Sequence, residues 1–502
     1  MTLARVSASA ADGRLTPAHA ACAAAPQLSD LLTVEDDSAL AGMVCGQTGL
    51  PYWPQIRSLF LRMAISDFLY ATPLLAPRGH SVAGTRALST LGRSVLHNFG
   101  LRPACDRGAA VCIFSSGVGN QLQEGKWLNR LSDHFALAHP GGTLTFEDHF
   151  EWRWPFPRAN ERVLLHAPLQ AATSVAGRLR ERDSHRRQAR ELVQFVSGRA
   201  ERILGWRPGA QREEQLVQVL ARKIAALPAQ LRSYEKVLSR IRPRVLLALA
   251  ATYGPAAALM AAARRRGVVT AEYQHGVVAA GHDGYNFAPA IRQSAAYRET
   301  LPEHFLTYGD WWGGTINAPL RMTTIGNPHR SARLLRLPKA QAKDIVLVLS
   351  DGTEFEMYLC FAQRVAAQMR RPGLRVVIRP HPVERSQVAS VHGRGVGNVS
   401  IDQNTDLYES LSSAHAVVSE LSTALFEAVG VAERLFVWDT AKARFMFPVR
   451  PFAVVDSAEM LADLLSDTEA GRVPAATAEA IWAEGWESRY QRFLEQQGAS
   501  PV

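Results

Sequence analysis

The chain has 502 residues, enough for about three domains of average size, which excludes a peptide or a single small module. Hydrophobic residues make up 47% of it and charged residues 20%, a globular composition that excludes wholesale disorder. The formal net charge of +10 predicts a surface that attracts anions, whether nucleotides, nucleic acid or an acidic membrane face.

The first 30 residues predict a flexible tail. The stretch Met1–Pro26 is rich in Ala, carries Asp12 and Arg14, and contains no compact run of Leu, Ile, Val or Phe, which favours a tail over a signal peptide. The five cysteines are scattered without C-x-x-C spacing, so neither a zinc site nor a disulfide framework is indicated. We therefore expect a cytoplasmic protein.

The middle of the chain alternates strand-like and helix-like stretches. Residues 173–240 are rich in Arg, Glu and Gln, with Leu and Val at helical spacing, and Trp206–Gly209 interrupts them. This pattern predicts two or three amphipathic helices inserted into the N-terminal half, with a solvated charged face. Short apolar runs around the insertion predict strands that begin at Val111, Leu144, Val163, Val245, Val268 and Phe305.

One uncharged stretch, Val245–Ala263, is long enough to cross a bilayer and is followed by three arginines. Ala is only weakly apolar, however, and Gly254 with Pro255 divides the stretch into two pieces. We therefore expect a strand, a turn and a helix here, and not a membrane span.

The last third of the chain has the clearest pattern. Continuous apolar runs separated by helical stretches predict a parallel sheet that is covered on both faces. The runs expected to form strands are Ile345–Ser350, Arg375–Pro380, Val399–Asp402, Ala416–Ser419, Leu435–Trp438 and Phe452–Val455.

A turn-rich stretch, Ile325–Lys339, separates the two alternating sets. We therefore predict an α/β protein with two doubly wound, Rossmann-like domains facing one cleft. The N-terminal domain would cover residues 31–328, including the helical insertion, and the C-terminal domain residues 329–470. The remainder, 471–502, contains a predicted helix, Ala478–Gln497, with aromatic residues at helical spacing, and we expect it to pack back across both domains.

Polar residues follow three strands of the C-terminal set, where open α/β sheets bind ligands. Small turns and helix N-termini offer N–H groups to phosphate, hydroxyls add hydrogen bonds, and a cation balances the charge. The set therefore predicts a pocket for a nucleotide diphosphate, with Glu427 one helical turn deeper to accept hydrogen bonds from ribose hydroxyls. The alternatives are that Ser422 is a plain helix cap and that His381 is a structural turn residue. The members of the set are Ser350, Gly352, Thr353, Arg379, His381, Ser419, Ser422 and Thr423.

Two of these motifs resemble a known family. R-P-H-P at Arg379–Pro382, paired with S-E-L-S-T-A-L-F-E-A at Ser419–Ala428, resembles the donor half of GT-B glycosyltransferases that build bacterial surface polysaccharides. These include polysialyltransferases, Kdo transferases and, more distantly, CDP-glycerol glycerophosphotransferases. The resemblance covers about residues 325–456. It implies that His381 and the Ser/Thr residues of the second motif contact the phosphates of a nucleotide-activated donor.

The N-terminal half is expected to bind the acceptor and to supply a base. The Q-H-G turn that contains His275, followed by Asp283, is similar to a turn of related surface-polysaccharide enzymes. Glu147 and Asp148 end another strand in a sequence similar to the E-D-G turn of some sialic acid transferases, although His149 replaces the glycine. A sugar hydroxyl is a poor nucleophile at neutral pH, so Glu147, Asp148, His275 and Asp283 are the candidates for the base.

We therefore predict a glycosyltransferase that moves a sugar from a nucleotide-activated donor to a growing surface polysaccharide, capsule or lipopolysaccharide, or to a lipid-linked saccharide. The displacement is expected to be inverting, with neither a bound metal nor a further cofactor, and the donor nucleotide stays open between CMP and UDP. No Walker, G-x-G-x-x-G or H-E-x-x-H motif is present.

The positive charge favours peripheral attachment to the anionic inner face of the cytoplasmic membrane. A nucleic-acid partner is not expected. Two other functions are kept as alternatives. One is a sugar-nucleotide epimerase of the same architecture, and the other is a basic nucleic-acid-binding or scaffolding protein that uses the arginines of 178–202.

Overall fold

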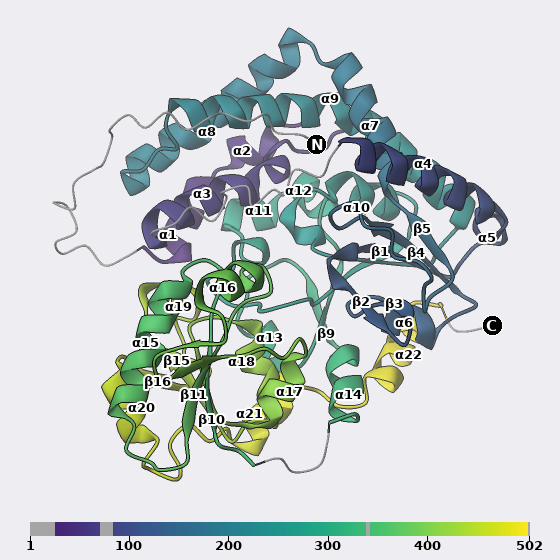
Figure 1. Ribbon diagram of the computed structural model, residues 1–502. Helices are drawn as coiled ribbons and strands as arrows, with labels where there is room; N and C mark the ends of the chain where they lie inside the picture. The colour runs from purple at the N-terminus through teal and green to yellow at the C-terminus, as the bar shows by residue number, and fades with distance from the viewer. Residues whose placement is uncertain (1–25, 71–83, 338–341, 500–502) are drawn as a thin grey trace.

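The computed structural model describes residues 26–70, 84–337 and 342–499 (Figure 1). The predicted tail thus lies almost wholly outside the described residues. From Leu28 on, the chain is folded and does not belong to a tail. Leu28 begins helix α1 (Leu28–Leu32), in which Leu28 and Leu31 are buried in the N-terminal core.

The N-terminal half forms one parallel sheet of seven strands in the order β5-β4-β1-β6-β7-β8-β9. Alternate residues of a strand enter different core clusters, Cys112 and Phe114 on one face and Val111 and Ile113 on the other, which explains the continuous apolar runs. The six predicted strands are confirmed. The strands are β1 (Val111–Ser116), β4 (Thr143–Asp148), β5 (Val163–Leu165), β6 (Val245–Ala248), β7 (Val269–Tyr273), β8 (His304–Thr307) and β9 (Arg321–Thr324).

The C-terminal half forms a second seven-stranded sheet in the order β12-β13-β11-β10-β14-β15-β16. All pairs of neighbouring strands in this sheet are parallel except β12 and β13, which are antiparallel. The predicted α/β class with two doubly wound sheets is therefore confirmed. The strands are β10 (Ile345–Leu349), β11 (Arg375–Arg379), β12 (Gly395–Val396), β13 (Val399–Ile401), β14 (Ala414–Ser419), β15 (Arg434–Trp438) and β16 (Ala453–Val455).

Helices cover both sheets, and the predicted insertion is three helices that cap the N-terminal sheet (Figure 1). They are α7 (Ala167–Arg180), α8 (Asp183–Leu204) and α9 (Ala210–Ile241), with the break between α8 and α9 where it was predicted. The other N-terminal helices are α2 (Ser38–Gly42), α3 (Arg57–Leu69), α4 (Gly84–Gly100), α5 (Arg102–Arg107), α6 (Asp133–Ala138), α10 (Ala257–Arg264), α11 (Pro289–Gln293), α12 (Ala295–Glu299), α13 (Asp310–Gly313) and α14 (Pro328–Leu334).

The C-terminal sheet carries α15 (Phe355–Gln368), α16 (Arg385–His392), α17 (Leu407–Ser412), α18 (Thr423–Glu427), α19 (Ala441–Met446) and α20 (Ala458–Leu464). The uncharged stretch at 245–263 is β6, a turn and α10, as predicted. Gly254 in that turn has φ +104°, and a Cβ there would lie 1.8 Å from Pro54 O, so only glycine fits. Among the described residues no helix is both long and apolar enough to span a bilayer.

The C-terminal segment packs against both halves, but it is two helices and not the single one predicted. Gly485, at φ +68°, separates α21 (Ala475–Ile481) from α22 (Trp486–Gln496). Trp482 packs between the halves against Tyr308, at 5.2 Å between ring centroids. Helix α22 places Tyr490 and Phe493 in the core under the N-terminal sheet (Figure 1). The prediction that the aromatic stripe serves packing agrees with this burial.

Candidate active site

The turns after β10 and β11 pack against each other at the carboxyl edge of the C-terminal sheet. The backbone N–H of His381 donates to Ser350 Oγ at 2.9 Å and to Glu384 Oε1 at 2.9 Å. Gly352 lies against the imidazole, because a Cβ on it would come within 2.7 Å of His381 Nδ1, and its φ of +87° favours glycine. The structure thus brings Ser350, Gly352 and His381 together.

The next turn of this edge follows β14. Ser419 is buried, and its hydroxyl donates to the last carbonyl of β10 at 3.2 Å. Ser422 Oγ accepts a hydrogen bond from the N–H of Ala424 at 3.2 Å, as a helix N-cap does. In the order β11-β10-β14 this turn lies two strand spacings, roughly 10 Å, from the His381 turn. Both turns therefore share one edge of the sheet, with the Ser350 turn between them.

Thr423 is one of the residues at which the two halves of the chain meet. Its Oγ1 accepts a hydrogen bond from the N–H of Val277 at 3.3 Å. Gly276 lies so close that a Cβ on it would be 3.5 Å from the same oxygen. Because these two residues directly follow His275, the Q-H-G turn after β7 and the S-x-x-S-T turn after β14 form one junction.

The turn that contains Thr353 differs from the predicted phosphate cradle. Asp351 Oδ1 accepts hydrogen bonds from the N–H groups of Thr353 at 2.8 Å and Glu354 at 3.3 Å, and its Oδ2 accepts from the Thr353 hydroxyl at 2.6 Å. The donors that were expected to meet a phosphate are therefore already occupied by an aspartate of the same turn.

Arg379 also differs from its predicted role. Its guanidinium pairs with Asp402 and donates to Ser410 Oγ at 2.9 Å and to the carbonyl of Asn404 at 3.0 Å. Because it is the last residue of β11 and its side chain is buried toward the next strand, this cation fixes the β13–α17 connection. The structure does not place it as a free cation for a phosphate.

Glu427 lies one helical turn after Thr423, as predicted, and is buried. Its carboxylate is near Tyr408 and Arg330, and burial together with Glu427 raises the pKa of Tyr408 well above its usual value. The Arg330 guanidinium lies 4.8 Å from the Trp482 ring centre. The role of Glu427 toward a ribose stays a prediction.

A cleft of about 260 Å³ lies between the two halves, beside the junction. Arg62 of α3 and the turn with His282 and Asp283 form one wall, and Leu421 and Lys442 belong to the other. Asp283 thus lies in the interdomain cleft. Its carboxylate accepts from Arg62 Nε at 3.1 Å. Although burial raises the pKa of Asp283, the positive charges of Arg62 and its neighbours outweigh this effect and hold it below the usual value.

A chain of polar side chains connects this cleft to the Q-H-G turn. Tyr253 OH lies 3.1 Å from His282 Nε2 and 3.5 Å from His275 Nε2, and the Arg62 guanidinium lies 4.8 Å from the centre of the tyrosine ring. Burial, with Arg62 nearby, lowers the pKa of His275 to about 3 and that of His282 to about 4. Both imidazoles are therefore neutral at physiological pH and too weakly basic to match a general base that works near neutrality.

Lys442 and three carboxylates form a buried cluster on the other wall. The ammonium lies 2.9 Å from Asp351 Oδ2, 2.7 Å from Glu354 Oε2 and 2.8 Å from Glu420 Oε2. The Tyr358 hydroxyl donates to Glu420 at 2.5 Å. Burial alone would lower the pKa of Lys442, but Glu420 and Asp351 raise it more. One positive charge thus ties together two of the turns at the carboxyl edge and helix α19.

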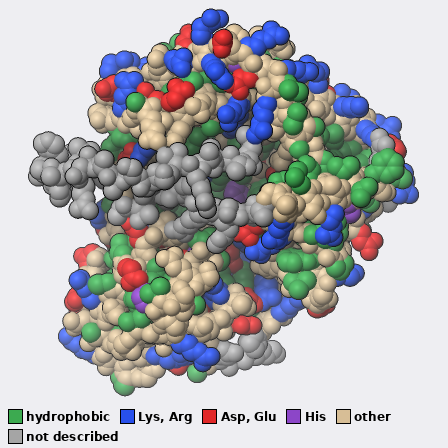
Figure 2. Space-filling model, turned by 45° about the horizontal axis from the view of Figure 1, so that its top comes forward, with side chains coloured by type: hydrophobic (Ala, Val, Ile, Leu, Met, Phe, Trp, Pro, Cys, Tyr) green, Lys and Arg blue, Asp and Glu red, His purple; other side chains and the backbone are tan. Residues whose placement is uncertain are grey.

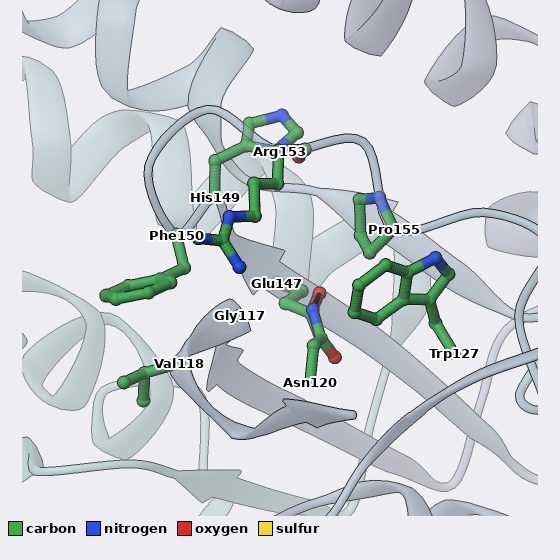
Figure 3. A pocket seen from close by; sticks show the side chains of 9 residues that line it. All are labelled: Gly117, Val118, Asn120, Trp127, Glu147, His149, Phe150, Arg153 and Pro155. Atoms are coloured by element: carbon green, nitrogen blue, oxygen red, sulfur yellow. Dashed lines mark hydrogen bonds between the residues drawn. The ribbon is translucent and has the colours of Figure 1, made fainter. Parts of the chain in front are cut away.

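Glu147, the last residue but one of β4, lies at the base of a small pocket in the N-terminal half (Figure 3). Its carboxylate accepts from Asn120 at 2.7 Å, from Asn129 at 2.8 Å and from Arg158 at 2.7 Å, and Arg158 also pairs with the buried Asp133. A buried carboxylate with all these donors is held as a structural ion pair. The hairpin β2 (Asn120–Gln123) and β3 (Lys126–Asn129), which the sequence did not predict, forms part of the pocket wall. The pocket is lined by Gly117, Val118, Asn120, Trp127, Glu147, His149, Phe150, Arg153 and Pro155.

Asp148 points away from this pocket, as strand alternation requires. Its side chain is 40% exposed, and Oδ1 bonds to His166 Nδ1 at 2.7 Å and accepts from Gln170 at 2.9 Å. The hydroxyl of Tyr234 lies 3.1 Å from His166 Nε2. Asp148 is thus the most exposed of the four candidate bases, with an imidazole behind it to hold its orientation.

The four candidate bases occupy two separate places. In the order β4-β1-β6-β7, the end of β4 with Glu147 lies three strand spacings, roughly 14 Å, from the end of β7 that precedes His275. Glu147 and Asp148 therefore do not act on the same atom as His275 and Asp283.

Sequence reasoning missed one carboxylate of the site, Glu272 on β7. It is fully buried, accepts from Tyr285 OH at 2.6 Å and from the N–H of Thr252 at 2.9 Å, and burial raises its pKa to about 7. A Glu within an apolar strand, in the T-A-E-Y run before the Q-H-G turn, was the available signal. Buried carboxylates with raised pKa values concentrate at functional sites.

Glu272→Gln is expected to change how stability depends on pH. From about pH 4.5 to 7 the folded protein retains a proton on Glu272 that the unfolded chain releases, so the free energy of unfolding falls as pH rises, by about 3 kcal/mol over this range. The buried histidines act with the opposite sign, but they cancel in the difference between the two proteins. Urea titrations of both at pH 5 and pH 8 measure this difference. Parallel pH profiles of the two proteins would contradict the assignment.

The comparisons with known proteins give distant structural likenesses. Neither the models of known protein families nor the curated proteins give a match. Among solved structures, the UDP-GlcNAc 2-epimerase from Methanocaldococcus jannaschii is 10% identical and has a TM-score of 0.44, with 77% of this chain and 99% of that chain covered. The glycosyltransferase of kitacinnamycin is 14% identical and has a TM-score of 0.43, with 78% and 99% covered. The UDP-GlcNAc 2-epimerase from Neisseria meningitidis, bound to UDP-GlcNAc, is 10% identical and has a TM-score of 0.41, with 77% and 98% covered.

Proposed function

We propose that this protein is a GT-B glycosyltransferase that transfers a sugar from a nucleotide-activated donor to a saccharide acceptor of a bacterial surface polysaccharide. The observation that carries the proposal is the junction in which Thr423 Oγ1 accepts from Val277 N–H. It joins the motif that resembles a donor site to the Q-H-G turn of the other half, at the carboxyl edges of both sheets and beside the cleft.

In the proposed reaction, the donor phosphates lie between the turns of His381 and Ser422. The Ser422 and Thr423 hydroxyls would donate to phosphate oxygens, His381 would stabilise the departing phosphate, and Glu427 would accept from the ribose. Ser350, Gly352 and Ser419 shape the edge through their bonds and close packing. We assign no contact with the donor to Arg379 or Thr353, because their side chains already bond to Asp402 and Asp351 respectively.

The acceptor would bind in the N-terminal half at the pocket of Figure 3. Trp127 and Phe150 offer flat apolar surfaces to a sugar ring, while Arg153 supplies N–H groups (Figure 3). This second pocket favours a transferase, because an epimerase needs no acceptor. We assign the base to Asp148, which lies on the other side of the end of β4 from this pocket, so an acceptor of several sugar units would extend from the pocket past the strand end to reach it. The exposed carboxylate would take the proton of the attacking hydroxyl as the bond to the departing phosphate breaks. This reaction requires the two halves to close on the bound substrates, because the end of β4 lies roughly 14 Å from the junction. The proposal includes no bound metal.

Product analysis tests this function. The purified protein is incubated with CMP- and UDP-linked sugars, with and without a mixture of polysaccharide oligomers. A transferase releases free nucleotide only when acceptor is present and lengthens the oligomers by whole sugar units. Conversion of the nucleotide-sugar to an epimer without acceptor would overturn the proposal in favour of an epimerase.

Ser422→Ala is expected to lower kcat/KM by roughly 10²-fold, because it removes a hydroxyl aimed at the charge of the departing phosphate. The matched control is Ser457→Ala at the N-cap of α20, where Ser457 Oγ accepts from the N–H of Met460 at 3.3 Å. Both variants lose a helix cap, at a cost of about 1 kcal/mol of stability. Steady-state kinetics and urea titration of each measure the two effects. If the variants lose activity equally, Ser422 is only a cap.

A further inference from the structure

Helix α4 has an unusual orientation. Several apolar side chains face outward, and four of its polar side chains face the protein: Thr90, Ser94, His97 and Asn98. Leu88 is 71% exposed, Leu96 75% and Phe99 66%. Val95, which is 51% exposed, lies seven residues after Leu88 and four residues before Phe99. This spacing places the three side chains in one stripe along the helix. In a soluble protein the apolar face of such a helix would normally be buried.

The reason for this orientation is the free edge of the N-terminal sheet. Strand β5 is the last in its sheet, and α4 satisfies its backbone with side chains. The Asn98 amide donates to Leu165 O and accepts from its N–H, both at 2.8 Å, and His97 Nε2 donates to Val163 O at 2.7 Å. The polar face is thus fixed inward, and the apolar stripe necessarily lies on the surface.

The neighbouring helix α7 extends this surface. Val175 and Leu179, four residues apart, are 54% and 82% exposed. Within α4 and α7 the sequence holds Arg86, Arg93, Arg178 and Arg180 and no Asp or Glu at all. Figure 2 shows the result, with hydrophobic side chains gathered over this face and Lys and Arg around them. A surface that exposes Leu and Phe, and whose charged residues are all arginines, complements an anionic bilayer.

We propose that the α4–α7 face, made of the exposed apolar residues and the four arginines just named, docks the protein on an anionic membrane. The apolar stripe would enter the interface between headgroups and acyl chains, and the arginines would contact lipid phosphates. The inward face of α4 holds the loop of the Figure 3 pocket, since Thr90 Oγ1 donates to Trp152 O at 3.1 Å and Ser94 Oγ lies 2.9 Å from His149 Nε2. Docking would therefore bring that pocket close to lipid headgroups.

Vesicle flotation of the full chain tests this inference. The wild-type protein is expected to float with vesicles of phosphatidylcholine and phosphatidylglycerol, less so at high salt, and not with phosphatidylcholine alone. Leu96→Glu with Phe99→Glu is expected to lower the bound fraction about tenfold or more, because two carboxylates then meet the anionic surface. The matched control is Val391→Glu with Val449→Glu, whose side chains are 66% and 84% exposed on the C-terminal half.

Three results would overturn the proposal. The first is no flotation of the wild-type protein at low salt, and the second is unchanged flotation of the α4 variant. The third is a dimer in size-exclusion chromatography that the α4 variant converts to a monomer, which would assign this face to a second copy of the chain. Membrane docking is independent of the proposed reaction, and nucleotide binding distinguishes a failure of one from a failure of the other. We expect the α4 variant to bind nucleotide as tightly as the wild-type protein does.

Discussion

Lys442→Met is expected to lower the free energy of unfolding by about 3–5 kcal/mol at neutral pH. The substitution leaves Asp351, Glu354 and Glu420 buried around an apolar side chain, with no positive charge among them. The loss should shrink as pH falls, because protonation of the three carboxylates then relieves their repulsion. Urea titrations at pH 7.5 and pH 5 measure both parts of this prediction.

The control for Lys442 lies on the same helix. Arg444 pairs with Asp439 at 2.8 Å, but its side chain is 54% exposed, so Arg444→Met is expected to cost less than about 1 kcal/mol. If Lys442→Met were as mild as the control, the cluster would not hold the turns at the carboxyl edge in place. Because these carboxylates already neutralise Lys442, we also do not assign it to the donor phosphates.

Asp148→Asn is expected to lower kcat by roughly 10²- to 10⁴-fold, the range that a general base contributes. The amide keeps the size of the side chain but no longer takes up the proton of the attacking hydroxyl. Glu147→Gln, one residue earlier on β4, is the comparison. The Glu147 carboxylate already accepts hydrogen bonds from Arg158 and two asparagines, so its replacement should change kcat less than about tenfold.

The free energy of unfolding also distinguishes these two carboxylates. Glu147→Gln removes one charge from the buried cluster of Glu147, Arg158 and Asp133 and should lower this free energy. Asp148→Asn, on the exposed side of the strand, should change it little. Equal losses of kcat in the two variants, or a larger loss in Glu147→Gln, would contradict the assignment of the base to Asp148.

Much of the fold could be predicted from the sequence because parallel strands buried on both faces are continuous apolar runs, as in the I-V-L-V-L of β10. The missed strand β9 has the sequence R-M-T-T and lies at an edge of its sheet, where burial does not demand apolar residues. The predicted single C-terminal helix is wrong because Gly485 adopts a left-handed conformation between two segments that share helical spacing.

The candidate site could be predicted only where its residues follow strands. Ser350, His381 and Ser422 lie at one edge because their strands are neighbours, and the pairing of motifs already indicated that. Arg379 shows the limit, since its position at the end of β11 was right but its side chain is held by Asp402. Lys442 meets a partner 91 residues away in sequence, a contact that no local pattern carries.

In the proposed function, the junction of the two halves binds a nucleotide-activated sugar. The decisive measurement is a thermal-shift panel of CMP, CDP, UDP and GDP with the wild-type protein and a His381→Ala, Ser422→Ala double variant. We expect one nucleotide to raise the wild-type Tm by mass action, by an amount that grows with its concentration, and to raise the Tm of the variant much less. If no nucleotide at millimolar concentration shifted the wild-type Tm, or if the variant responded as strongly, the claim would be contradicted.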